Sequence, residues 1–214
     1  MAFKIGLISQ KGGPGKSTTG RGLAVGFAQL EWSAIIADFD LDQLTSTEWV
    51  KIRLSNGHQP AVFAQPFGSV AQAIQHTQNY DVVIFDPKGE TSTITVDIAK
   101  ASDLVIIPTA LALDDLRPAA VLADRIHLKH GVPANRIVFA LNHTGDSESE
   151  IAEAREYLGQ KPYQVLDGHI PEKVSFRRAM DVGKSILETP YQGPREEAEK
   201  LIQAIINKVE ELTV

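Results

Sequence analysis

The chain has 214 residues and a formal net charge of -6, with 43% hydrophobic residues, 22% charged residues and no cysteine. That length fits one domain spanning residues 1–214, and the acidic balance argues against a wholly basic protein that coats nucleic acid, although a local basic patch can still bind DNA. The lack of cysteine excludes disulfides, thiolate metal sites, iron–sulfur clusters and a cysteine nucleophile.

Five short apolar runs are predicted to form buried strands, because each run is continuous rather than alternating. They span residues 3–9, 34–37, 82–85, 104–107 and 137–141. Helical spacing of apolar residues predicts helices at residues 18–30, 69–78, 116–130, 148–158 and 195–212. The alternation predicts an α/β three-layer sandwich, in which helices flank a mostly parallel sheet. No apolar run reaches the roughly 20 residues of a membrane span and the first run is too short for a signal peptide, so we expect a cytoplasmic protein.

A glycine-rich segment lies between the first predicted strand and the first predicted helix. It reads Lys11-Gly12-Gly13-Pro14-Gly15-Lys16-Ser17-Thr18. Backbone N–H groups of such a turn converge on an anion, and the following helix adds the positive end of its dipole. Lys16 is expected to reach the β- and γ-phosphates of ATP, and the Ser17 hydroxyl is expected to coordinate Mg²⁺. The segment predicts a P-loop of variant form, because Gln10 stands where the general pattern has glycine.

Lys11 distinguishes this P-loop from the general kind. Together Lys11 and Lys16 match the deviant Walker A motif, K-G-G-x-G-K-[ST], and the chain resembles the ParA/MinD family of ATPases. Its length is similar to that of the short ParA-type (ParF-like or VirC-like) plasmid partition proteins, which lack an N-terminal helix-turn-helix. The resemblance implies a P-loop NTPase fold and a homodimer that forms on ATP, in which Lys11 reaches the phosphates of the partner subunit. A solvated surface lysine is the ordinary alternative.

The second predicted strand ends in Asp38-Phe39-Asp40, which looks like the D-x-D segment of the same family. Carboxylates at the end of such a strand lie in the crevice where open α/β sheets bind ligands. The resemblance implies that Asp40 orients or activates the attacking water and that Asp38 supports the water shell of the metal. The family commonly continues with Pro-Gln, whereas this chain has Leu41-Asp42-Gln43, so Asp42 is a substitute candidate. Ordinary turn formation is the alternative.

The third predicted strand ends in Asp86, which is the Walker B arrangement that holds Mg²⁺ directly or through water. Lys88, Gly89 and Glu90 follow at the place where relatives sense the γ-phosphate. We therefore predict a switch loop there, with an ordinary turn as the alternative.

Later segments extend the resemblance along nearly the whole chain. Residues 101–109 resemble the fifth-strand segment of the short ParA-like proteins, and residues 114–116 fall where those proteins begin their dimer-facing helix. Asn142 stands where the family reads adenine with an amide, and Pro171 lies in the segment that closes over the base. An asparagine that caps the following turn is the alternative for Asn142.

A basic cluster near the end of the chain is predicted to contact DNA phosphates, with a merely solvated face as the alternative. It consists of Lys173, Arg177, Arg178 and Lys184. The resemblance implies a nucleoid-associated partition ATPase that binds DNA nonspecifically, carries plasmid cargo and is stimulated by a cargo-bound adaptor of ParB type.

Two other functions compete with this interpretation. A MinD-like ATPase that cycles on membranes needs a basic, lipid-seeking terminal helix, whereas the last predicted helix carries Glu196, Glu197, Glu199, Glu210 and Glu211. A metabolic enzyme, such as a dethiobiotin synthetase or a cobyrinate amidase, shares the P-loop and sheet but does not require Lys11. Stable membrane association is therefore not expected.

Overall fold

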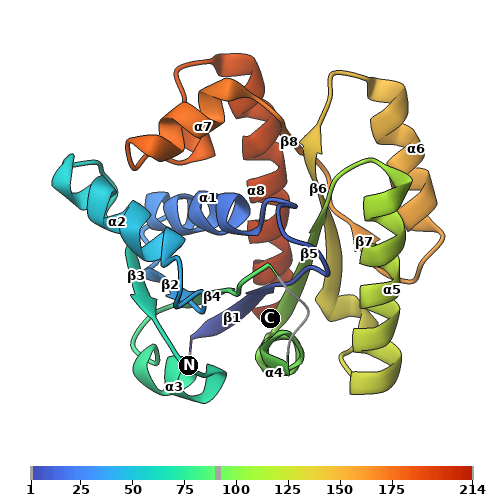
Figure 1. Ribbon diagram of the computed structural model, residues 1–214, viewed down its shortest axis with the longest axis horizontal. Helices are drawn as coiled ribbons and strands as arrows, with labels where there is room; N and C mark the ends of the chain where they lie inside the picture. Colours follow the sequence, from blue (N-terminus) through green and yellow to red (C-terminus); the bar gives the residue numbers. More distant parts are fainter. Residues whose placement is uncertain (1, 90–92, 214) are drawn as a thin grey trace.

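A computed structural model describes residues 2–89 and 93–213 (Figure 1). Its centre is one sheet in which every described pair of strands is parallel. The strand order is β3-β2-β4-β1-β5-β6-β7, with β8 paired to β6. The strands are β1 (Phe3–Leu7), β2 (Ala34–Asp38), β3 (Phe63–Pro66), β4 (Val82–Asp86), β5 (Leu104–Thr109), β6 (Ile137–Thr144), β7 (Gln164–Val165) and β8 (Ile170–Pro171).

Helices cover both faces of this sheet and complete the predicted three-layer α/β sandwich (Figure 1). One face is covered by α3 (Val70–His76), α4 (Thr93–Ala101), α5 (Leu113–His130) and α6 (Glu148–Gly159). The other is covered by α1 (Lys16–Gln29), α2 (Thr45–Ser55), α7 (Val174–Asp181) and α8 (Gln192–Thr213). Helix α1 packs against α8. Short 3-10 turns lie at Ala134–Arg136 and Ile186–Glu188.

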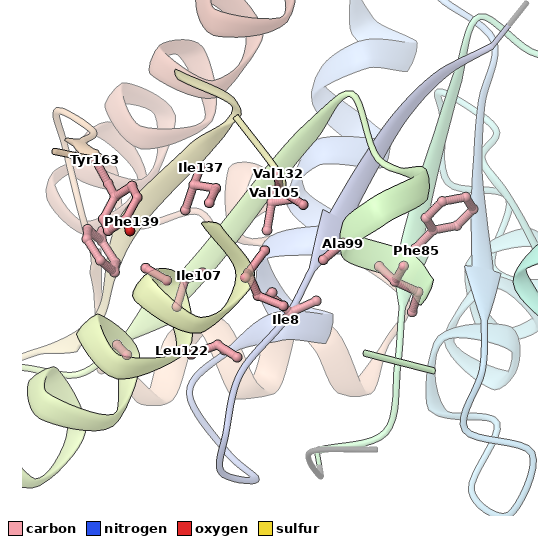
Figure 2. Packing of buried hydrophobic residues seen from close by; sticks show 14 of the residues in the cluster. Ile8, Phe85, Ala99, Val105, Ile107, Leu122, Val132, Ile137, Phe139 and Tyr163 are labelled. Atoms are coloured by element: carbon pink, nitrogen blue, oxygen red, sulfur yellow. The ribbon is translucent and has the colours of Figure 1, made fainter. Parts of the chain in front are cut away.

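Side chains of the strands pack into two separate hydrophobic cores, one on each face of the sheet. This explains why the strand sequences are continuously apolar. In β5, Val105 and Ile107 contact the core under α4, α5 and α6, whereas Leu104 and Ile106 contact the core under α1 and α8. All four are fully buried. Figure 2 shows the first core, where the rings of Phe139 and Tyr163 meet edge to face with centroids 5.9 Å apart. Both side-chain directions of a strand are therefore apolar.

The five strands and five helices expected from the sequence are confirmed, with small shifts at their ends. The first strand ends at Leu7 rather than Ser9, because Ser9 already belongs to the turn, where its hydroxyl donates to the carbonyl of Lys11 at 2.7 Å. The sequence did not indicate β3, β7, β8, α2, α4 or α7. Among the described helices, none is both long and apolar enough to cross a membrane.

Candidate nucleotide-binding site

The glycine-rich loop, β2 and β4 meet at one cavity of about 570 Å³, at the carboxyl edge of the sheet. Because β4 lies between β1 and β2, the residues that follow these three strands converge there. The cavity is lined by Gly12, Gly13, Gly15, Lys16, Ser17, Thr18, Arg21, Asp40, Gln43, Thr45, Asp86, Pro87, Lys88, Gly89 and His143. Most of the residues predicted to bind the phosphates thus line the same cavity.

The loop has the backbone shape of a phosphate cradle. Gly13 and Gly15 have φ angles of 91° and 90°, values that side-chain-bearing residues rarely adopt. Gly15 precedes α1, so the free N–H groups of the first turn point toward the cavity. Lys16 is buried, and its Nζ donates to the Ser9 hydroxyl at 2.9 Å. Burial lowers the pKa of Lys16, while Asp86 and Asp40 oppose that shift. The ammonium group of Lys16 is therefore a poorly solvated cation, positioned to bind an anion in the cavity.

Asp86 lies beside the loop as a buried carboxylate with two hydroxyl partners. Ser17 Oγ donates to Oδ1 at 3.1 Å, and Ser46 Oγ from α2 donates to Oδ2 at 2.7 Å. Burial raises the pKa of Asp86, against the effect of these two hydrogen bonds. A hydroxyl and a carboxylate at this separation are the oxygen ligands that Mg²⁺ prefers, so Ser17 and Asp86 fit the metal.

Asp38 is held by hydrogen bonds to the start of α2. Its Oδ2 accepts hydrogen bonds from the backbone N–H groups of Ser46 and Thr47 and from the Thr47 hydroxyl, while Oδ1 accepts from the N–H of Asp40. Only 1% of the residue is exposed, and it does not line the cavity. A carboxylate with four such partners caps the start of α2. It also lies beside Asp86 in the register of β2 and β4, and its support of the metal's water shell stays a prediction. Asp40, in contrast, lines the cavity, as a water-orienting residue must.

The segment after β4 closes one side of the cavity. Lys88 Nζ lies 2.9 Å from Asp42 Oδ2, so an ion pair joins this segment to the loop after β2. A Cβ atom built on Gly89 would lie 2.7 Å from the Cα of Gly12, which requires glycine at this approach. Glu90, the third residue of the predicted switch, lies outside the described residues.

Lys11 points away from its own phosphate cavity. Its Nζ contacts the carbonyl oxygen of Asp114 at 2.6 Å and Asp115 Oδ1 at 3.3 Å, at the start of α5. The side chain is 53% exposed, and Lys11 does not line the cavity. Within one subunit the two lysines of the motif therefore face different surroundings.

A second cavity of about 280 Å³ adjoins the first and contains the residues predicted to bind the base. Pro171 of β8 lines it beside Asn142. The Asn142 side chain, however, is fully buried, and its amide nitrogen donates to Pro14 O at 3.0 Å, Gly15 O at 3.4 Å and Thr19 Oγ1 at 2.9 Å. These bonds occupy the donors of the amide, so in this structure Asn142 holds the P-loop to the end of β6.

Comparison with known proteins places this site in a family. Residues 5–186 match the CobQ/CobB/MinD/ParA nucleotide binding domain. The chain belongs to this family. Its ParA- and MinD-type members are ATPases, and the chain is accordingly a P-loop ATPase whose cofactors are ATP and Mg²⁺.

Three similar proteins illustrate the range of this ParA/MinD-type family. The chain is 22% identical to the chromosome-partitioning ATPase Soj of Thermus thermophilus, over 97% of both chains. The septum site-determining protein MinD of Pyrococcus horikoshii, solved with Mg-ADP, superposes with a TM-score of 0.77 at 17% identity, covering 100% of this chain and 99% of that one. A plasmid partition protein of Borrelia burgdorferi bound to AMPPNP gives a TM-score of 0.73 at 17% identity, covering 97% and 100%.

The basic cluster of this ParA/MinD-type ATPase lies on and around α7, but acidic neighbours engage part of it. Lys173 Nζ is 2.5 Å from Asp146 Oδ1, and Arg177 Nη1 is 3.3 Å from Glu172 Oε1. Arg178 is exposed. Lys184 is only partly exposed, and its carbonyl accepts a hydrogen bond from the Trp49 indole at 3.2 Å. The four cations are near one another in sequence, yet they do not form a uniformly free basic surface.

Sequence reasoning missed several polar residues of the ATPase site, among them Gln43, Thr45 and His143, which line the larger cavity. Ser9 holds Lys16, Ser46 joins α2 to Asp86, and Arg21 lines both cavities. Arg21 had a detectable signal, because it follows Thr18 by one helical turn and must share its face of α1. Ser46 had none, since its contact with Asp86 spans forty positions of the sequence.

Proposed function

We propose that residues 1–214 form a single-domain ParA-type switch that dimerises on binding ATP, binds DNA nonspecifically and partitions plasmid DNA. A cargo-bound adaptor of ParB type would stimulate its ATP hydrolysis, and the ATP-bound dimer would associate with the nucleoid. The observation that supports this proposal best is the position of Lys11. It stands on an exposed loop beside the nucleotide cavity, yet its ammonium group is directed away from that cavity. A second subunit facing the loop would bring its own Lys11 to these phosphates.

The proposed mechanism relies on positioning and electrostatics, because phosphoryl transfer to water needs little covalent help from a protein. Lys16 would neutralise the β- and γ-phosphates from within the subunit, and Ser17 and Asp86 would hold the metal. Lys11 of the partner subunit would stabilise charge that develops on the leaving oxygen. Asp40 would orient the attacking water. The loop that contains Lys88 and Gly89 would change its conformation when the γ-phosphate is lost. Bound Mg²⁺ supplies charge neutralisation at the phosphates.

Two lysine variants test the dimer. Lys16→Ala should abolish ATP binding, whereas Lys11→Ala should leave ATP binding within about threefold of wild type and lose both ATP-dependent dimerisation and turnover. Isothermal titration calorimetry measures binding, and analytical ultracentrifugation with an ATP analogue measures the dimer. Lys51→Ala, which removes an exposed lysine paired to Glu48, is the matched control. A Lys11→Ala protein that dimerises and hydrolyses ATP normally would refute the role in trans.

DNA binding is tested separately, because the basic cluster is partly neutralised by Asp146 and Glu172. The double variant Arg177→Ala/Arg178→Ala should weaken retention on random-sequence duplex in the presence of ATP. Retention should also fall steeply as salt is raised, since phosphate contacts release counterions. Unchanged retention in the variant would exclude the cluster. Absence of retention at low salt in the wild-type protein would exclude DNA as the surface on which the switch cycles.

A vesicle-binding assay, set beside the DNA assay, separates the partition function from a MinD-like one. Leu201, Ile205 and Val209 are fully buried, so the apolar face of α8 packs against the sheet. We therefore expect no ATP-dependent sedimentation with anionic lipid vesicles. Sedimentation with vesicles, combined with no retention on DNA, would favour membrane cycling.

A further inference from the structure

Arg21 occupies the junction between the two cavities of the nucleotide site. The phosphate cavity and the smaller cavity beside Pro171 share four lining residues, which are Gly15, Thr18, Arg21 and His143. Arg21 lies on α1 one turn beyond Thr18, so both side chains point to the same face of the helix. A nucleotide whose β- and γ-phosphates lie against the P-loop and whose base enters the smaller cavity must pass this junction with its α-phosphate and sugar.

The guanidinium of Arg21 is held in place, but its N–H donors make only long hydrogen bonds within the described part of the chain. Its Nε donates to Ser46 Oγ at 3.4 Å, and its Nη1 lies 3.8 Å from the sulfur of Met180. The carbon at its centre lies 5.6 Å from the ring of Trp49. Among the described residues it forms no ion pair. Burial lowers the pKa of Arg21, and Asp86 and Asp38 only partly oppose that effect.

Arg53 provides an internal comparison, because it lies over the same indole at the same distance of 5.6 Å. Its guanidinium donates to both carboxylate oxygens of Glu188, at 2.8 and 3.0 Å, and to the carbonyl oxygens of Pro60 and Gly183. Arg53 is therefore a structural arginine with its hydrogen bonds made. Arg21 has the same aromatic support but retains donors for an incoming anion, and it faces a cavity instead of a carboxylate.

We infer that Arg21 binds the α-phosphate of the nucleotide and so fixes the join between the triphosphate and the nucleoside. This inference rests on the proposed placement of phosphates in the P-loop cavity. A guanidinium presents two parallel N–H groups to a phosphate, and Trp49 keeps the plane of the fork oriented. Binding would replace a long contact to a hydroxyl and a contact to a thioether with charge-assisted hydrogen bonds. Arg21 is a positioning residue, because the bond that breaks lies between the β- and γ-phosphates.

The test uses ADP and the two stereoisomers of ADPαS, in which sulfur replaces one non-bridging oxygen of the α-phosphate. ADP has no γ-phosphate to lose, so its affinity is measured at equilibrium by calorimetry on the full chain. We expect Arg21→Met, which keeps the stem and removes the charge, to bind ADP about 10- to 100-fold more weakly than wild type. In the wild-type protein one stereoisomer of ADPαS should bind less tightly than the other. In Arg21→Met the ratio of their dissociation constants should fall toward one.

Arg21→Lys keeps the charge and supplies the second variant should Arg21→Met fail to fold. Its ADP affinity should fall by less than that of Arg21→Met, and its stereoisomer ratio should still shrink, because a point charge does not reproduce the two-pronged fork. Wild-type ADP affinity in either variant would overturn the inference. Weaker ADP binding with an unchanged stereoisomer ratio would also overturn it, since Arg21 would then act only through the packing of α1. ADP binding that survives Lys16→Ala would instead show that the placement of the phosphates is wrong.

Discussion

The substitution Asn142→Ala separates two roles for this residue, holding the P-loop and reading adenine. The buried amide nitrogen donates to Pro14 O and Thr19 Oγ1 at 3.0 and 2.9 Å, with a longer contact of 3.4 Å to Gly15 O. Each good hydrogen bond contributes about 1 kcal/mol to stability, and the buried acceptors left behind add to the loss. The Oδ1 atom of Asn142 has no partner in the described residues, so its removal offsets part of this loss.

The balance predicts a decrease of about 2 kcal/mol in the free energy of unfolding without nucleotide. For a chain of this size each kcal/mol corresponds to about 2–4 °C, so the Tm should fall by about 4–8 °C. The loop also loses its tether to β6, so affinity for ATP and for GTP should fall by similar factors. Thermal unfolding by circular dichroism measures the first effect, and calorimetric titration with each nucleotide measures the second.

Asn207→Ala is the matched control, because Asn207 lies on an exposed part of α8, where its side chain accepts a hydrogen bond from Gln203. Its Tm should stay within about 1 °C of wild type. A Tm for Asn142→Ala equally close to wild type, with ATP binding weakened and GTP binding unchanged, would refute the reasoning. Asn142 would then contact the base, as the family resemblance implied.

Three further predictions concern ionisable side chains that are buried or partly buried. Asp86→Asn should raise the free energy of unfolding at neutral pH by about 1–2 kcal/mol, because it removes a buried carboxylate, and it should abolish Mg²⁺-dependent ATP hydrolysis; a lower Tm would contradict this. Arg53→Met should lower stability by about 3–5 kcal/mol in urea unfolding, because Glu188 and two carbonyls lose their partner; a loss below about 1 kcal/mol would mean that the network is dispensable. Burial lowers the pKa of His169 despite nearby Glu197, so the folded state favours the neutral ring. Its contribution to stability should be present above about pH 6.5 and decrease as the pH falls, and His169→Asn should flatten that slope in thermal scans at successive pH values.

The sequence was informative about elements whose burial is uniform and poorly informative about the others. Strands β4 and β5 are apolar on both sides, so their patterns are unmistakable. Helix α2 was not predicted, because its buried face includes the polar residues Ser46, Thr47 and Arg53 and therefore shows no continuous apolar stripe in the sequence. Strand β3 lies at the edge of the sheet, and three of its four residues are exposed, so it lacks a buried pattern.

The same distinction applies to the site. The P-loop was predictable because the chemistry of phosphate binding fixes residue types within eight consecutive positions. The partners of Asp38 were not, because the D-x-D pattern specifies two carboxylates and says nothing about which one the next helix will use as its cap. That choice depends on the turn through Leu44, whose φ of 49° brings Ser46 and Thr47 back over the strand.

The hydrogen bond from Ser46 to Asp86 gives the protein a built-in optical probe. Ser46 at the start of α2 contacts Asp86, the carboxylate that we propose holds the metal, and one turn later the helix carries Trp49, one of only two tryptophans in the chain. The guanidinium groups of Arg21 and Arg53 each lie 5.6 Å from the centre of this indole, and their charges affect its emission. The other tryptophan, Trp32, packs against Phe27 at the far end of α1. Replacing Trp32 with phenylalanine would leave Trp49, which contacts Arg21 of the nucleotide site, as the single tryptophan. Changes at this site could then be followed by stopped-flow fluorescence without a label.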